Sequence, residues 1–310
     1  MMAIYLGIDG GGSKTSCLIG DETSVLGAGT GGASNLVRVG EAQARESLAT
    51  AIRQACTVAN IKPSEISSVC VGLAGAARPE IGELVRGIVS EVISGEIKPD
   101  EINVVGDMVI ALEAAFGNGP GVIVIAGTGS IAYGRDREGQ TARAGGWGFA
   151  ISDEGSGHWI GRAAVAAAIG AWDEKPVENV RLIEILLKSW HVETVEQLVP
   201  AANATPPPDF AALFPSVLSL ADSGDRLARD VLTQAGTQLA NLAGILLRRL
   251  FPNSGTVPVA MSGGVFGSSA LVRQIFYNCL CSEHPDATLN PSVIEPVRGA
   301  LELARKGVAK

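Results

Sequence analysis

The sequence has little that would suit a nucleic-acid-binding protein or a disulfide-linked secreted protein. Lysine and arginine number 24 against 32 aspartate and glutamate, which gives a formal net charge of -8. Binding along a nucleic acid needs a clustered basic surplus, whereas a single anion can still be bound by backbone N–H groups. The five cysteines are an odd number without a framework spacing, and they favour free thiols in a reducing compartment.

The sequence also lacks any run that approaches the ~20 apolar residues of a membrane span. Its first residues lead directly into an apolar strand without the pattern of a signal peptide. We therefore expect a cytoplasmic protein with neither a membrane nor a nucleic acid as partner. With 310 residues, 46% hydrophobic and 18% charged, the chain suits two compact domains separated by a cleft.

Glycine is abundant, and its first cluster follows a buried strand. The apolar residues 4–8 run into the turn Asp9-Gly10-Gly11-Gly12-Ser13-Lys14-Thr15, and a returning strand is predicted over 15–20. Glycines permit positive φ and let backbone N–H groups approach phosphate oxygens. The order Gly-Ser-Lys-Thr followed by a strand excludes a Walker A loop. Taken alone, the turn fits an ordinary hairpin as well as a phosphate site.

The second half of the chain repeats this arrangement. A strand over 122–126 ends in Gly127-Thr128-Gly129-Ser130, and two short strands follow at 131–134 and 141–144. The repetition predicts a duplicated α/β fold in which two such turns could grip a polyphosphate from both sides of a cleft. A dinucleotide-binding interpretation is weak, because no third small residue opens a helix and no suitable acid follows about 20 residues later.

The remaining pattern assigns elements and domain boundaries. Further strands are predicted at 24–29, 67–73, 102–105 and 257–261, and helices at 40–60, 108–116, 155–172, 178–188, 226–250 and 293–306, with one more starting near residue 79. The loop at 118–121 separates an N-terminal domain, residues 1–117, from a C-terminal domain, residues 118–292, which carries a helical insert. Residues 293–310 are expected to form a C-terminal helix that packs back on the N-terminal domain.

Three motifs carry a resemblance across the full length. The turns at 8–15 and 126–130 and the segment Met261-Ser262-Gly263-Gly264-Val265-Phe266 resemble the two phosphate motifs and the adenosine motif of the actin, heat-shock ATPase and hexokinase superfamily. The chain most resembles the BadF/BadG/BcrA/BcrD-type ATPase family, and its residues 145–161 are similar to the sugar-binding loop of the N-acetylglucosamine kinase branch. The resemblance implies two ribonuclease H-like domains, ATP and Mg2+ as cofactors, and phosphorylation of an amino sugar, foremost N-acetylglucosamine to its 6-phosphate.

The resemblance also assigns roles to residues. Asp107 is the expected catalytic base, and Asp9 is the expected magnesium residue. The expected ATP contacts are Gly11, Gly12, Ser13, Lys14, Thr128, Gly129, Gly263, Gly264 and Ser268. The expected sugar contacts are Asn35, Asp107, Ser130, Gly146, Trp147, Gly148 and Asp153. Plainer interpretations stay open: a helix N-cap for Asp107, a solvated lysine for Lys14 and a core residue for Trp147.

Alternatives remain at this stage. Ile131 stands where the mammalian-type kinases carry a polar amide. Glucosamine and N-acetylmuramic acid therefore stay open as alternative substrates beside N-acetylglucosamine. A second hypothesis is an ATPase activator of a 2-hydroxyacyl-CoA dehydratase, but the cysteines do not follow its iron–sulfur pattern. A third is a non-catalytic nucleotide or sugar sensor, although no helix-turn-helix precedes the first strand and no zinc-binding cysteine cluster is present. The resemblance is also compatible with a homodimer.

Overall fold

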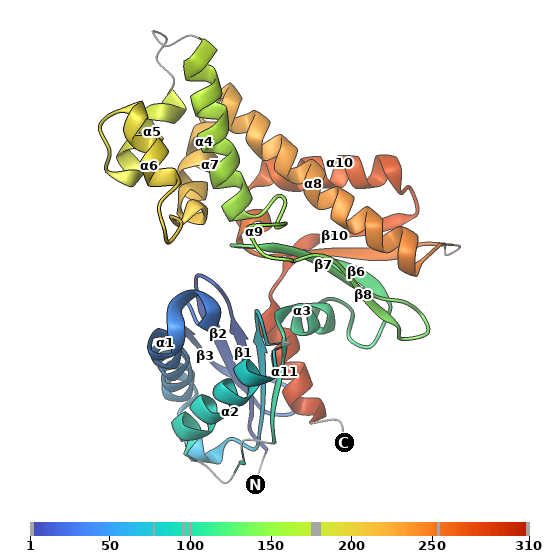
Figure 1. Ribbon diagram of the computed structural model, residues 1–310. Helices are drawn as coiled ribbons and strands as arrows, with labels where there is room; N and C mark the ends of the chain where they lie inside the picture. The colour runs from blue at the N-terminus through green and yellow to red at the C-terminus, as the bar shows by residue number, and fades with distance from the viewer. Residues whose placement is uncertain are drawn as a thin grey trace. The chain divides into compact units, whose positions relative to one another are not determined.

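The computed structural model describes residues 3–76, 78–94, 97–98, 101–174, 181–252 and 255–307. The chain divides into two compact units. Unit 1 comprises residues 1–123, 133–139 and 294–310, and unit 2 comprises residues 124–132 and 140–293. Each unit is built on a five-stranded sheet with helices packed against it, which confirms the predicted two-domain α/β fold (Figure 1).

The sheet of unit 1 has the strand order β3-β2-β1-β4-β5. Its strands are β1 (Tyr5–Gly10), β2 (Thr15–Gly20), β3 (Val25–Gly31), β4 (Ser68–Leu73) and β5 (Ile102–Gly106). The first three strands form an antiparallel meander, whereas β4 runs parallel to both β1 and β5. The carboxyl ends of β1, β4 and β5 therefore lie at one edge of the sheet, which is where open α/β sheets commonly bind ligands.

Helices cover both faces of this sheet (Figure 1). They are α1 (Leu36–Ala59), the 3-10 turn η1 (Pro63–Glu65), α2 (Pro79–Ile93), α3 (Asp107–Phe116) and α11 (Pro296–Lys306). Helix α1 lies so close to β3 that a Cβ on Gly29 would come within 2.1 Å of the Ala51 carbonyl oxygen. On the other face, α11 packs on β1, and a Cβ on Gly7 would meet the Leu301 nitrogen at 2.3 Å. Both positions require glycine, because a side chain there would collide with the backbone of the packed helix.

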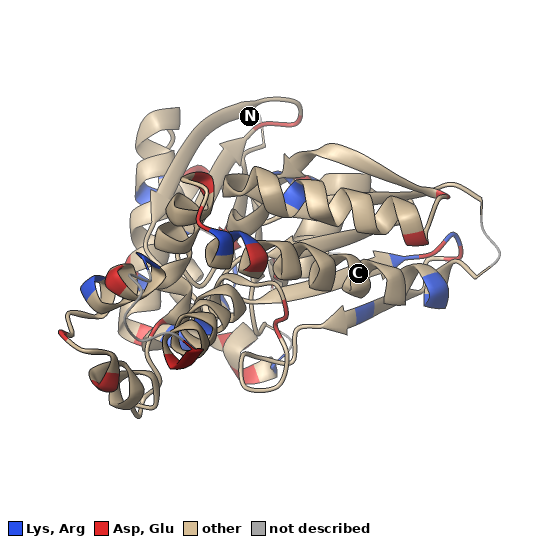
Figure 2. Ribbon diagram, turned by 90° about the horizontal axis from the view of Figure 1, so that it is seen from above, with Lys and Arg blue, Asp and Glu red and all other residues tan. Residues whose placement is uncertain are grey.

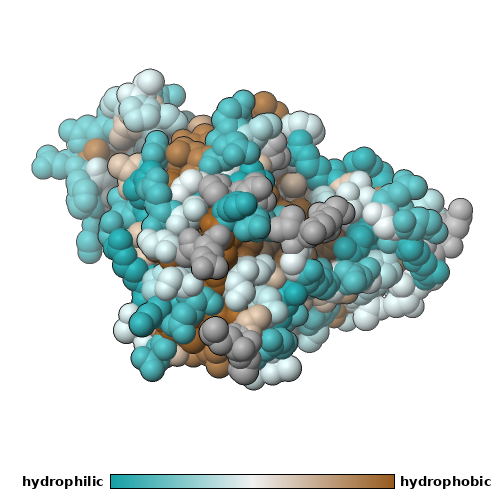
Figure 3. Space-filling view, turned by 90° about the horizontal axis from the view of Figure 1, so that it is seen from below, coloured by the Kyte–Doolittle hydropathy of each residue, from teal (hydrophilic) through white to brown (hydrophobic). Residues whose placement is uncertain are grey.

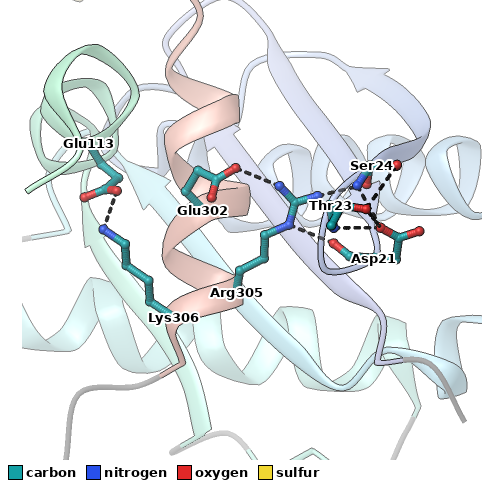
Figure 4. Close-up of polar contacts among 7 residues, drawn as sticks. All are labelled: Asp21, Thr23, Ser24, Glu113, Glu302, Arg305 and Lys306. Carbon is teal, nitrogen blue, oxygen red and sulfur yellow. Dashed lines mark hydrogen bonds and ion pairs between the residues drawn. The ribbon is translucent and has the colours of Figure 1, made fainter.

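Basic side chains fasten α11 to the rest of unit 1 (Figure 4). Arg305 donates from Nε to the Asp21 carbonyl oxygen at 2.7 Å and from Nη2 to the Ser24 carbonyl oxygen at 2.8 Å. Lys306 Nζ donates to Glu113 Oε1 of α3 at 2.6 Å. Glu113 is only 8% exposed, so this lysine neutralises a carboxylate that solvent hardly reaches.

The sheet of unit 2 has the order β10-β9-β6-β7-β8. Its strands are β6 (Gly121–Ala126), β7 (Ser130–Arg135), β8 (Thr141–Gly145), β9 (Val257–Ser262) and β10 (Ala287–Ile294). Helix α8 (Arg226–Leu250) and helix α10 (Ala270–Glu283) pack on each other, and α8 also contacts β8. The helical insert adds α4 (Gly157–Glu174), α5 (Arg181–Trp190), α6 (Val195–Ala202), η3 (Phe210–Leu213) and α7 (Phe214–Asp222).

The structure differs from the sequence prediction mainly near the C-terminus. Residues 287–294 form the strand β10, which the sequence did not indicate, and the last helix accordingly begins at Pro296 instead of near residue 293. Only part of β10 is apolar, because it lies at an end of the strand order. Helix α1 begins earlier than predicted, at Leu36, and contains a non-helical residue at Gly40. The predicted start of the helix at 178 lies outside the described residues.

Charged residues of both signs are distributed over the two units. In the view of Figure 2, acidic and basic residues are interspersed along the helices. Hydrophilic residues make up much of the face seen in Figure 3, with hydrophobic ones showing between them. Among the described helices, none combines the length and the apolar character that a membrane crossing would require.

Candidate active site

The first glycine turn joins β1 to β2 in unit 1. Gly11 N donates to the Lys14 carbonyl oxygen at 2.9 Å, and this bond closes the hairpin. Gly10 has no room for a side chain, because a Cβ there would lie 2.3 Å from Leu73 Cδ1 and 2.7 Å from Ser34 Oγ. Ser13 and Lys14 are exposed. The turn thus has a tightly packed base and an exposed tip.

Two buried hydroxyls hold this turn against the loop after β3. Thr15 Oγ1 lies 2.7 Å from the Gly32 carbonyl oxygen and 2.7 Å from Ser34 Oγ. The backbone N–H groups of Ser34 and Asn35 both donate to the Gly11 carbonyl oxygen, at 3.1 Å and 3.2 Å. The structure therefore places Asn35 directly beside the phosphate-type turn. Sequence reasoning missed Thr15 and Ser34, whose only signal is a small hydroxyl within each of two glycine-rich segments.

Asn35 also has a structural role. It is the N-cap of α1, and its side-chain oxygen accepts from Val37 N at 3.2 Å. An N-cap asparagine satisfies one of the free N–H groups in the first turn of a helix. Its amide nitrogen is still a donor that a hydroxyl-rich ligand could use.

Two carboxylates meet at the sheet edge of unit 1. Asp9 stands near the end of β1, and Asp107 is the first residue of α3, directly after β5. Burial raises the pKa of Asp9 from its ordinary value of 3.8 to about 7. The negative charge of Asp107 adds to the rise, and Lys14 opposes it. The two carboxylates are thus electrostatically coupled, with Lys14 as a nearby positive charge.

Asp107 is also held in an environment that disfavours its charge. Burial raises its pKa, while hydrogen bonds from the Met108 N–H and its own N–H oppose the rise. The Met108 nitrogen lies 2.9 Å from Asp107 Oδ1. The N-cap interpretation from the sequence is wrong, because Gly106 is the N-cap and Asp107 is already helical.

The second glycine turn joins β6 to β7 in unit 2. Gly127 N donates to the Gly129 carbonyl oxygen at 2.9 Å and closes the turn. The start of α4 is attached to it, because Gly157 N donates to the Gly127 carbonyl oxygen at 2.8 Å and His158 N to that of Thr128 at 3.2 Å. The carbonyls of the turn are therefore occupied by protein donors, which favours binding an anion rather than a cation there.

Asp153 lies over this turn. Its backbone has a φ of 69°, and its Oδ1 accepts from Ser130 N at 3.3 Å. A Cβ on Gly129 would meet Asp153 Oδ2 at 2.9 Å, so the glycine makes room for the carboxylate. Burial raises the pKa of Asp153, the charge of Glu154 contributes, and the Ser130 hydrogen bond opposes the rise. The structure thus brings together Gly129, Ser130 and Asp153.

The loop of residues 145–152, called here the 145–152 loop, follows β8. Gly145, Gly146 and Gly148 have φ values of 71°, 68° and 94°, which only glycine adopts readily. A Cβ on Gly146 would lie 2.7 Å from Ile131 Cδ1, so Gly146 packs on the start of β7. Trp147 is 64% exposed, which excludes the interpretation of this residue as core.

The third glycine turn follows β9 and lies next to the second. Gly263 has a φ of 98°, and a Cβ there would stand 2.3 Å from the Ala126 carbonyl oxygen at the end of β6. A Cβ on Gly264 would meet open space, and Ser268 is exposed at the end of α9 (Gly264–Ser268). Strands β6 and β9 are neighbours, so their turns share one sheet edge in unit 2.

The 3-10 turn η3 of the helical insert packs against the first part of α4. Phe210 is buried in η3, and a Cβ on Gly161 would come within 1.9 Å of its carbonyl oxygen. A Cβ on Gly157 would lie 3.5 Å from Ala211 Cβ. The start of α4 therefore touches both the second glycine turn and this segment.

The described residues contain no group of three or more His, Cys, Asp or Glu side chains that could enclose a metal ion. Magnesium does not need such a cage, because it is commonly held by one or two carboxylates together with phosphate and water. Asp9 fits this chemistry, since its burial beside Asp107 leaves negative charge poorly compensated.

Two five-stranded sheets of this arrangement, each with a glycine turn after a buried strand, have the fold of the actin-like ATPase superfamily. The model of the BadF/BadG/BcrA/BcrD ATPase family matches residues 6–304. The chain belongs to this family.

Individual relatives match over nearly the whole chain. The N-acetylmuramic acid/N-acetylglucosamine kinase of Clostridium acetobutylicum is 30% identical over 308 residues, covering 98% of this chain and 99% of that protein. The N-acetyl-D-glucosamine kinase of Dictyostelium discoideum is 28% identical over 314 residues, covering 97% of each. The crystal structure of a Chromobacterium violaceum protein has a TM-score of 0.73 and 27% identity, covering 97% of this chain and 98% of that one.

Proposed function

We propose that the protein transfers the γ-phosphate of ATP to an amino sugar, with N-acetylglucosamine and its 6-hydroxyl as the foremost substrate and acceptor. The observation that carries this proposal is the placement of two desolvated carboxylates, Asp9 and Asp107, at the edge that bears the glycine turn of unit 1. Phosphoryl transfer needs a base or orienting group, a cation site and a phosphate-binding turn. The kinase names of the two curated relatives supply the substrate class.

In this proposal the phosphates of ATP contact the backbone of Gly11 and Gly12 and the side chains of Ser13 and Lys14. Thr128 and Gly129 contribute a second set of N–H groups. The exposed tip of the first turn and the occupied carbonyls of the second support these roles. Asp9 would hold Mg2+, which when bound neutralises phosphate charge. The adenosine part would contact the third turn through Gly263, Gly264 and Ser268.

Asp107 accepts the proton of the sugar hydroxyl as the hydroxyl attacks the phosphorus. Burial raises its pKa and so makes the carboxylate a stronger base than an exposed aspartate. Because only the ionised form accepts a proton, the rate rises with pH through the pKa of Asp107. The hydrogen bond from the Met108 N–H to its Oδ1 orients the carboxylate.

The sugar hydroxyls contact Asn35, Ser130 and Asp153, and the 145–152 loop supplies Gly146, Trp147 and Gly148. Amides and carboxylates suit this task, because each presents two polar atoms to neighbouring hydroxyls. The high exposure of Trp147 supports its role as an apolar wall, since an indole in the core would have no access to a ligand. Glucosamine and N-acetylmuramic acid are the competing substrates.

The cysteines do not favour the activator hypothesis. Cys17, Cys56 and Cys70 are buried in unit 1, and burial raises the pKa of all three, to about 12 for Cys70. Iron–sulfur clusters are held by thiolates, which such surroundings disfavour.

The test is a coupled assay of ADP release with N-acetylglucosamine, glucosamine and N-acetylmuramic acid, each in the presence of Mg2+ and ATP. With at least one of these sugars, the rate at which the wild-type protein releases ADP is expected to increase with the sugar concentration. Asp107→Asn keeps the shape of the side chain but removes the base, and it should lower kcat by at least about 100-fold while ATP still binds. Retention of full activity by this variant would refute the role of Asp107, and the absence of sugar-dependent turnover with the whole panel would refute the proposed function.

A further inference from the structure

Arg143 interacts with three consecutive residues of the 145–152 loop. Its Nη1 donates to the carbonyl oxygens of Gly145 and Gly146, each at 3.2 Å. Its guanidinium carbon lies 3.8 Å from the centroid of the Trp147 ring, which is a cation–π contact. One side chain therefore fixes both the backbone and the aromatic residue of this turn.

The turn needs such support, because its backbone is unusual. Gly145 and Gly146 both have positive φ, so two successive peptide groups are turned in a direction that regular structure does not stabilise. Both hydrogen bonds come from one nitrogen, Nη1, whose two N–H groups are fixed in the plane of the guanidinium, whereas the ammonium of lysine rotates freely. Trp147 is 64% exposed, and an exposed ring has few neighbours to fix its rotamer.

Arg143 is itself anchored. It lies on β8, the last strand in the sheet order of unit 2. Strands at an edge leave backbone carbonyls without a partner strand, and the Arg143 carbonyl oxygen accepts instead from Arg249 Nη1 at 3.1 Å. Arg249 is in the last turn of α8, so the edge strand and the long helix are tied together at this residue.

The ring that Arg143 supports is one wall of a groove. It is lined by Trp147 and Ile151 of the 145–152 loop and by Gln238, Asn241 and Ile245 of α8. The groove has a volume of about 330 Å3. A change in the Trp147 rotamer would therefore change the shape of the surface that the loop presents.

We infer that Arg143 is a positioning residue, which holds the two carbonyls and the indole of the 145–152 loop in the arrangement that recognises the sugar. The inference rests on the proposed function, because it requires that the 145–152 loop binds the sugar. Arg143 acts through Gly145, Gly146 and Trp147 and takes no part in the chemical step itself. It sets the affinity for the sugar and leaves the affinity for ATP unchanged.

The kinetic test compares Arg143→Met and Arg143→Lys with the wild type. Arg143→Met should raise the KM for the sugar about tenfold, which corresponds to ~1.4 kcal/mol, with the KM for ATP unchanged. Arg143→Lys retains the positive charge but loses the fixed, planar N–H groups of the guanidinium, so its sugar KM should fall between those of the wild type and Arg143→Met. Arg226→Met is the matched control, because the side chain of Arg226 is 93% exposed on α8. An unchanged sugar KM in Arg143→Met, or an equal rise in both KM values, would overturn the inference.

A second measurement does not depend on activity. Trp147 is made the sole tryptophan by replacing Trp159, Trp172 and Trp190 with phenylalanine, and its fluorescence is quenched with acrylamide. Removal of Arg143 uncovers one face of the ring, so the quenching constant should rise at least about twofold, with Arg143→Lys again intermediate. If the constant does not change, Arg143 does not hold the ring. If it rises while no sugar is turned over by the wild type, the positioning role stands and the proposed function fails.

Discussion

Replacing Asp9 with asparagine should remove a loss of stability that the wild type shows as the pH rises, and it should inactivate the kinase. In the folded protein the pKa of Asp9 is about 7, against an ordinary value of 3.8, because burial and the charge of Asp107 disfavour the carboxylate. Between these two pH values the folded state holds a proton that the unfolded state has released. Stability therefore falls as the pH rises from about 4 to about 7 and is level above that. Asparagine carries no charge and removes this dependence.

The size follows from the same pKa. Each pH unit over which the two states differ by one proton is worth ~1.36 kcal/mol. Between pH 5.5 and the folded pKa near 7, the wild type should lose about 2 kcal/mol that Asp9→Asn does not lose. Any hydrogen bond that asparagine fails to make changes the stability of the variant by the same amount at every pH. The change with pH in the difference between the two proteins is therefore unaffected.

Equilibrium urea denaturation at pH 5.5, 7 and 8, without nucleotide or divalent cation, measures the difference. The stability of Asp9→Asn relative to the wild type should increase from pH 5.5 to about 7 and then stay level. Glu46→Gln is the matched control, because it removes an exposed carboxylate from α1 in the same unit. A difference between Asp9→Asn and the wild type that is the same at all three pH values would refute the reasoning.

Three further substitutions test the packing around the turns. Gly263→Ala should destabilise the protein by more than about 2 kcal/mol in thermal or urea unfolding, because its Cβ would stand 2.3 Å from a carbonyl oxygen at a φ of 98°, whereas Gly264→Ala should be nearly neutral. Lys306→Met leaves the carboxylate of Glu113, 8% exposed, without its cation and should cost about 1–2 kcal/mol, reduced from the cost of a fully buried pair because the lysine is 41% exposed. Thr15→Val removes the hydroxyl that holds the first turn; we expect a loss of about 1–3 kcal/mol and a higher KM for ATP, while unchanged values of both would contradict its role.

The sequence predicts the strands and turns of the fold where a local pattern of apolar residues and glycines determines them. Each apolar run that ends in glycines became a strand followed by a turn, since apolar residues bury and glycine permits the reversal. The strand β10 was not predictable, because its mixed polar pattern becomes meaningful only once β9 is beside it. Pairing between distant segments is a tertiary effect that no local pattern contains.

The site was predictable in part. Asp9 and Asp107 are nearly 100 residues apart in the sequence. Asp9 lies near the end of β1 and Asp107 directly follows β5, two strands of one parallel set, and the structure couples the two carboxylates electrostatically. The contacts of Thr15 with Ser34, and of Arg143 with the loop after it, depend on side-chain directions that the sequence does not specify. Residues that support a site were therefore missed more readily than residues that were expected to touch a ligand.

The cost of ionising Asp9 gives a further test of the cation site. A ligand that binds only the folded state stabilises it, and a divalent cation at this carboxylate would bind the ionised form. Mg2+ should therefore raise the urea midpoint of the wild type more at pH 8 than at pH 5.5, because at the lower pH the cation must displace a proton from Asp9. Asp9→Asn should show little stabilisation at either pH. Equal stabilisation of both proteins by Mg2+ would mean that the cation binds elsewhere. Metal binding would then not explain why Asp9 and Asp107 lie together at this edge of the sheet.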